Sequence, residues 1–197
     1  MKFISLVLHP LLMPTYTFTL VYFILPEVIR PLTIVILPFL FVTTFIIPVL
    51  SISMLKFSGS ITNLKLNNRA ERPLPFAFVS IFYAITSYMF VFKIHVNNTV
   101  AAMLISSTIL IVILTLISTK FKISIHSAGV GGVIGFLVCF GIYFPSSLIV
   151  YTIMITVIIA GLTMTSRLYL QAHRPYEILA GASLGFVFSF LGIFFFG

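Results

Sequence analysis

The chain contains no aspartate, and its only carboxylate side chains are Glu27, Glu71 and Glu177. Mg²⁺ and Ca²⁺ sites are usually built from several carboxylates, so this composition argues against a site of that kind. The single Cys139 excludes an intrachain disulfide and a zinc site made of several cysteines. We therefore expect no metal and no cofactor, and a site that works with histidine, basic and hydroxyl side chains.

Charge is scarce as well. Only 7% of the residues are charged, 60% are hydrophobic, and the mean hydropathy is +1.25, which excludes an ordinary soluble domain. The formal net charge is +8, but the basic residues stand in short loops between apolar runs. This pattern is typical of membrane topology and of contact with anionic lipid groups, and it argues against nucleic acid as a partner.

Apolar runs long enough to cross a bilayer follow one another along the whole chain. A span needs about 20 such residues. We therefore expect an all-α, polytopic integral membrane helix bundle in a single domain over residues 1–197, with six or seven transmembrane helices. The candidate spans are 3–25, 32–55, 74–93, 99–119, 127–145, 147–165 and 178–196.

Prolines and glycines add detail to these spans. Pro10 and Pro14 predict that the first run is the least regular. Two pairs of glycines four residues apart, Gly131/Gly135 and Gly181/Gly185, predict surfaces where helices pack closely. Hydroxyl residues within the spans, such as Thr43–Thr44 and Ser106–Thr108, are expected to bond their own helix backbone.

Seven spans bring three polar segments to the same side of the membrane. These segments are the loop 56–73 and the junctions 120–126 and 166–177. Several basic residues and two histidines can therefore converge at one membrane face without any of them crossing the bilayer. Such a group suits a phosphate better than a metal ion.

The most informative spacing lies in the last junction. His173 and Glu177 are four residues apart, so on a helix they share a face and can touch. A carboxylate that orients an imidazole makes it a better nucleophile or base. Arg167 precedes the pair, and its guanidinium could hold an oxyanion by two parallel hydrogen bonds.

Three short segments together carry a resemblance to a known family. Lys65, six residues, Arg72 and Pro73 resemble the first signature of the type 2 phosphatidic acid phosphatase superfamily. Ser124-Ile125-His126 resembles the second, and Ser166-Arg167 with His173 and Glu177 resembles the third. The resemblance covers residues 65–177 in the correct order and implies a fold core like that of the vanadium haloperoxidases.

The resemblance also implies a role for each matching residue. His173 would be the nucleophile that forms a phosphohistidine, Glu177 would orient it, and His126 would protonate the leaving group. The phosphoryl oxygens would be held by Lys65, Arg72, Ser124 and Arg167. Phosphoryl transfer depends mostly on positioning and charge stabilisation, which such cations provide.

The chain departs from the family pattern at several positions. Ile123 and Ile125 stand where the family usually has proline and glycine, so we expect a phosphate cradle of a different shape. Glu177 stands where the family has aspartate. Residues 74–119 are long and apolar enough for a membrane hairpin that turns at 93–98.

We therefore expect a metal-independent lipid phosphate phosphatase in a bacterial inner membrane, with the bilayer and a lipid phosphate as its partners. The alternative is a non-catalytic protein that binds or moves phospholipid with a degenerate phosphatase site; a small transporter is a weaker option. For the side of the membrane, the basic residues favour a cytoplasmic site, whereas the resemblance implies the outer face.

Overall fold

The computed structural model describes residues 1–29, 36–63 and 71–197, and every regular element in these ranges is helical. The first part of the chain forms α1 (Lys2–Val7), the 3₁₀ turn η1 (Pro10–Leu12), α2 (Met13–Ile24), α3 (Pro26–Ile29), α4 (Ile36–Phe41), η2 (Val42–Ile46) and α5 (Ile47–Phe57). It is followed by α6 (Pro73–Tyr88), η4 (Met89–Ile94), α7 (Asn98–Lys120), α8 (Ile125–Tyr143), α9 (Ser147–Tyr169) and α10 (Pro175–Phe196).

Six helices in the described ranges are long and apolar enough to cross a membrane, as expected for an integral membrane protein. They are Ile36–Phe57, Pro73–Ile94, α7, α8, α9 and α10. The first apolar run is instead broken into α1, η1 and α2, with the break at His9 and Pro10, so the prediction that this run is irregular is confirmed. The hairpin expected over 74–119 is also present and turns at His95, which has a left-handed backbone.

Local sequence explains where these helices begin and bend. The side chains of Asn97, Ser124 and Ser146 each accept a hydrogen bond from a backbone N–H in the first turn of the following helix. Two of the described segments are π-helical rather than α-helical, η2 (Val42–Ile46) and η4 (Met89–Ile94). The first, η2, ends two residues before Pro48, which has no N–H to complete the α-helical ladder of hydrogen bonds.

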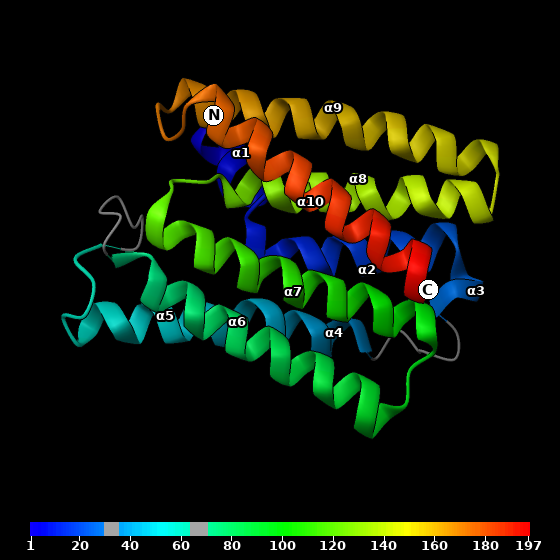
Figure 1. The fold of residues 1–197 in the computed structure, drawn as a ribbon, viewed down its shortest axis with the longest axis horizontal. Helices are drawn as coiled ribbons and strands as arrows, with labels where there is room; N and C mark the ends of the chain where they lie inside the picture. The colour runs from blue at the N-terminus through cyan, green and yellow to red at the C-terminus, as the bar shows by residue number, and fades with distance from the viewer. Residues whose placement is uncertain (30–35, 64–70) are drawn as a thin grey trace.

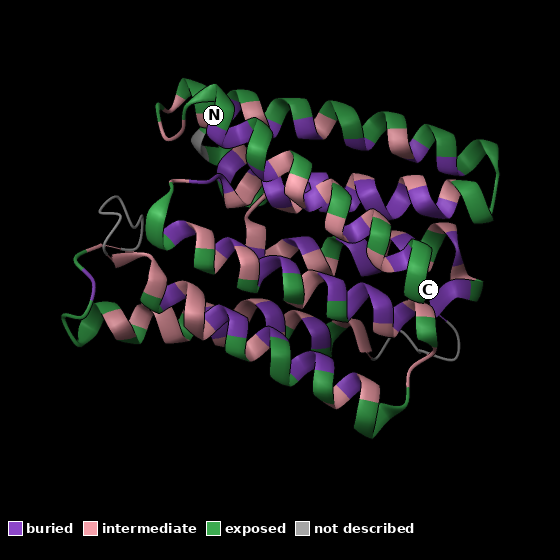
Figure 2. Ribbon diagram, in the orientation of Figure 1, coloured by how far each residue is buried: buried purple, intermediate pink, exposed green. Residues whose placement is uncertain are grey.

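Helix α8 lies at the centre of the bundle. In its most apolar stretch 61% of the residues are buried, the largest share among the six long helices, whereas in α9 the share is only 22% (Figure 2). Many of the exposed side chains of α9 are apolar. The hydroxyls of Thr44, Ser106 and Thr163 donate to carbonyls of their own helices, as expected for polar groups in a span.

Close packing of α8 on α10 depends on the predicted glycine pairs. A Cβ atom on Gly131 or Gly135 would overlap the backbone of Ala182 or Phe186, and one on Gly181 or Gly185 would overlap the backbone of Ser124 or Ala128. The prediction of helix-packing surfaces is therefore confirmed. The contacts advance in the same direction along both helices, so α8 and α10 are parallel and their N-termini lie at the same end of the bundle (Figure 1).

Candidate functional site

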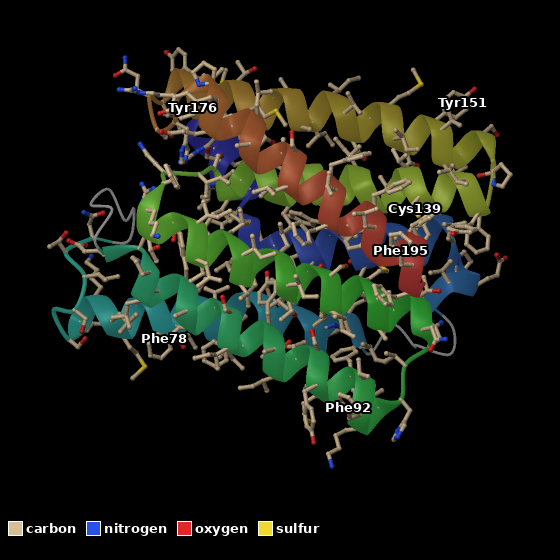
Figure 3. All side chains as sticks on the ribbon, viewed as in Figure 1. Phe78, Phe92, Cys139, Tyr151, Tyr176 and Phe195 are labelled. Carbon is tan, nitrogen blue, oxygen red and sulfur yellow. The ribbon has the colours of Figure 1, made fainter. Side chains whose placement is uncertain are left out.

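Four elements bring polar side chains together at that end of the bundle. Figure 1 shows α1, the N-termini of α8 and α10 and the C-terminus of α9 gathered there, and Figure 3 shows Tyr176 at the same end. An open pocket of about 620 Å³ lies at the turn between α9 and α10. It is lined by Lys122, Leu168, Gln171, His173, Arg174, Pro175, Tyr176 and Glu177.

A tight turn at the end of α9 sets the position of His173. The backbone N–H of Gln171 donates to Leu168 O, and that of Ala172 donates to Arg167 O. This pattern is a Schellman motif, which requires a left-handed residue after the helix. Gln171 takes that conformation with a φ of 49° where glycine would be usual. The chain therefore folds back directly after Arg167 and leads into His173 within six residues.

His173 and Glu177 form the contact that their spacing predicts. Nδ1 of His173 lies 2.8 Å from Oε2 of Glu177, and the two side chains are only 7% and 6% exposed. The same Oε2 accepts the backbone N–H of Arg174 at 3.2 Å, so Glu177 also caps the first turn of α10. Because a carboxylate only accepts, Nδ1 carries the hydrogen and Nε2 of the neutral ring keeps its lone pair.

The surroundings of His173 favour the neutral imidazole. Burial of the ring lowers its pKa to about 4, together with the positive charges of Arg167 and Lys122, although Glu177 acts in the opposite direction. A neutral ring with a free Nε2 is the form of histidine that acts as a nucleophile or base.

Arg167 lies in the last turn of α9, beside the histidines. Its Nη1 donates to Ser5 Oγ at 3.2 Å, whereas its Nε is buried and has no hydrogen-bond partner among the described residues. Arg72, the residue before α6, and His173 are close enough to interact with it electrostatically. A half-buried guanidinium whose Nε has no partner among the described residues, near a second cation, attracts an anion strongly.

His126 is held in the first turn of α8. Its Nε2 lies 3.2 Å from the backbone oxygen of Ser5. Because a carbonyl oxygen only accepts, Nε2 carries a hydrogen, and the free nitrogen of the neutral ring is Nδ1. The ring packs edge-on against His9, with 5.7 Å between the ring centroids.

Ser124 is fully buried behind Glu177 and does not line the pocket, and its hydroxyl is occupied by the cap of α8. Ser124 Oγ accepts the backbone N–H and the hydroxyl of Ser127, and its own backbone N–H donates to Glu177 O. The next residue, Ile125, is already helical. No left-handed backbone is needed at this point, so an isoleucine fits there without backbone strain.

The remaining sequence prediction, Lys65, lies outside the described residues. Neither Ser5 nor His9 was predicted from the sequence as a site residue, yet both contact residues of this site. The number of spans could have pointed to these two residues, because seven spans place the N-terminus on the same side of the membrane as the three polar segments.

Comparison with known proteins adds no assignment. A scan against models of known families, a search of curated proteins and a search of solved structures each found no match.

Proposed function

We propose that this protein is a metal-independent phosphatase that hydrolyses a phosphomonoester or diphosphate of a membrane lipid through a phosphohistidine intermediate. The observation that supports the proposal best is the buried His173–Glu177 pair beside Arg167, whose Nε has no hydrogen-bond partner among the described residues. A neutral, oriented imidazole next to a cation with an N–H left to donate is the minimum that nucleophilic attack on a phosphate needs. On this proposal the chain belongs with the haloperoxidase-like phosphatases.

The reaction divides into two displacements at phosphorus. In the first, Nε2 of His173 forms a bond to phosphorus while the bond from phosphorus to the lipid oxygen breaks. His126 donates a proton from Nδ1 to the departing alkoxide. In the second, water forms a bond to phosphorus while the bond from phosphorus to Nε2 of His173 breaks, His126 accepts a proton from that water, and phosphate leaves.

Charge stabilisation comes from the cations. Arg167 and Arg72, joined by Lys65 from the first motif, hold the phosphoryl oxygens as negative charge builds up on them. Since Nε2 of His126 donates to Ser5 O, the ring needs a second proton, on Nδ1, before it can act as an acid. The bound phosphate, as an anion, favours this imidazolium form.

The membrane setting favours a lipid as the substrate. The pocket opens at the end of a helix bundle and has Leu168 and Tyr176 in its lining. Helix α9, which leads to the pocket, turns exposed apolar side chains outward along its length. A head group could therefore enter the pocket while its hydrocarbon chains stay beside the bundle. Candidate substrates are phosphatidic acid, phosphatidylglycerol phosphate, an isoprenoid diphosphate and a phosphorylated lipid A or sphingoid base.

A phosphate-release assay tests this proposal. Purified protein in detergent micelles is mixed with each candidate lipid in the presence of EDTA. We expect release from at least one lipid, inhibition by vanadate, which imitates the transition state at His173, and no release by the His173→Ala variant. Strict dependence on Mg²⁺ would contradict the mechanism. A folded protein that binds lipid phosphates but releases no phosphate would favour the lipid-binding alternative.

A further inference from the structure

The N-terminal helix α1 contacts both proposed functional groups through one residue, Ser5. Its hydroxyl accepts a hydrogen bond from Arg167 Nη1, and its backbone oxygen accepts one from His126 Nε2, each at 3.2 Å. These contacts join residues more than 120 positions apart in the chain. Ser5 is only 9% exposed, so water competes little for them.

The hydroxyl of Ser5 is itself fixed by a chain of hydrogen bonds. Ser166 donates its hydroxyl hydrogen to Met1 O at 2.9 Å, so its oxygen is left to accept from Ser5 at 3.1 Å. The bonds therefore run in one direction, from Arg167 to Ser5, to Ser166 and to Met1. Each donor in such a chain strengthens the next bond, and the position of Ser5 Oγ is well defined.

The choice of Nη1 as the bonded nitrogen matters for what Arg167 can hold. Within a guanidinium, Nη1 lies on the same side as Cδ, so Nε and Nη2 form the opposite edge. That edge presents two parallel N–H groups and is one of the two that bind an oxyanion bidentately. Nε is buried, and neither Nε nor Nη2 has a hydrogen bond to a residue that the structure describes.

We propose that Ser5 is a positioning residue that holds Arg167 by Nη1 and so presents the Nε–Nη2 edge to a phosphoryl group. The inference rests on the proposed function for its role in turnover, but oxyanion binding can be measured without turnover. It adds an N-terminal element to a site whose sequence motifs all lie between residues 65 and 177.

A double-mutant cycle on the full chain in detergent tests this role, with orthovanadate as the probe. We expect Ser5→Ala to weaken vanadate binding about 10- to 100-fold, the range for one hydrogen bond to a charged group. Ser5→Thr keeps the hydroxyl and should bind within about threefold of the unchanged protein. In an Arg167→Ala background, Ser5→Ala should have no further effect, because the group that it positions is absent.

Matched controls separate positioning from folding. Ser107→Ala removes a hydroxyl that bonds only its own helix and should leave vanadate binding unchanged. Thermal unfolding of each variant checks that it is folded. If Ser5→Ala does not fold, Ser166→Ala, which removes the next bond in the chain, should weaken binding in the same direction and also depend on Arg167.

The outcomes divide clearly. Vanadate binding that depends on Ser5 only when Arg167 is present supports the inference, even if no lipid phosphate is hydrolysed. An equal loss from Ser5→Ala with and without Arg167, no loss at all, or no vanadate binding by the unchanged protein would overturn it. Hydrolysis that is insensitive to Ser5→Ala would overturn the inference alone and leave the proposed function in place.

Discussion

Replacing Glu177 by glutamine isolates the charge that faces His173. Oε2 of Glu177 accepts two hydrogen bonds, from His173 Nδ1 at 2.8 Å and from the Arg174 N–H at 3.2 Å. Both neighbours are donors, so the amide oxygen of glutamine takes the same place and the geometry is kept. Only the negative charge is lost.

The size of the effect follows from Coulomb's law. As Nε2 attacks phosphorus, the ring of His173 gains positive charge about 5 Å from the carboxylate. With an effective dielectric constant of about 20, the lost attraction is about 3 kcal/mol, or roughly a 10²-fold fall in kcat. Loss of a group that orients a functional histidine has effects of about this size.

The same variant should also change the pH profile. Burial of the ring and the nearby cations lower the pKa of His173, and Glu177 raises it; the net result is a pKa of about 4. Without the carboxylate the pKa falls further. The acidic limb of kcat/KM, where His173 becomes protonated, should therefore move to lower pH while the rate at its plateau falls.

Initial rates of phosphate release from micellar lipid between pH 3.5 and pH 8 measure both effects. Glu177→Ala is the companion variant: it removes the charge and both accepted hydrogen bonds, so its rate and its thermal stability should lie below those of Glu177→Gln. A Glu177→Gln rate within threefold of the unchanged protein, or an acidic limb that moves to higher pH, would refute the reasoning.

Three further predictions concern His126, the α8–α10 interface and the charge of His173. His126→Ala should slow hydrolysis of a lipid phosphate, whose leaving group is an alkoxide, about 10²- to 10⁴-fold. Hydrolysis of nitrophenyl phosphate should slow much less, because the nitrophenolate leaving group needs little protonation. Equal losses on the two substrates would exclude His126 as the general acid. Gly185→Ala should lower the thermal stability strongly, because its Cβ would overlap the backbone of Ala128, whereas Gly161→Ala, with open space at its Cβ, should not. Thermal stability should also fall as the pH drops from 6.5 to about 4. In this range His173 binds a proton in the unfolded chain, where its pKa is 6.5, but not in the folded protein, where burial lowers the pKa to about 4. The His173→Gln variant should lose the part of this pH dependence that comes from His173.

Much of the fold could be predicted from the sequence because a bilayer restricts the possibilities. Apolar runs of about 20 residues become helices, and the number of runs decides which loops share a side. The glycine pairs of α8 and α10 were readable for the same reason, since close helix packing in lipid depends on small residues. The π-helical segment Met89–Ile94 could not be predicted, because it contains no proline or glycine that would mark it.

In the candidate site, local contacts could be predicted from the sequence and long-range contacts could not. The contact between His173 and Glu177 follows from helical spacing and could be predicted. The contacts of Ser5 and His9 could not, because they depend on how α1 packs against helices far along the chain, and no local pattern encodes that. The hydroxyl of Ser124 illustrates a third case, in which a motif residue is held by the cap of its own helix.

The most direct test of the account is detection of the covalent intermediate. The protein is mixed with a lipid phosphate labelled at phosphorus, in EDTA, and quenched in alkali, in which phosphohistidine survives. We expect label on the peptide that contains His173, no label on the His173→Ala variant, and loss of the label when unlabelled substrate is added. Turnover of the same lipid with no label on the protein under any quench time, or label on the His173→Ala variant, would contradict the central claim.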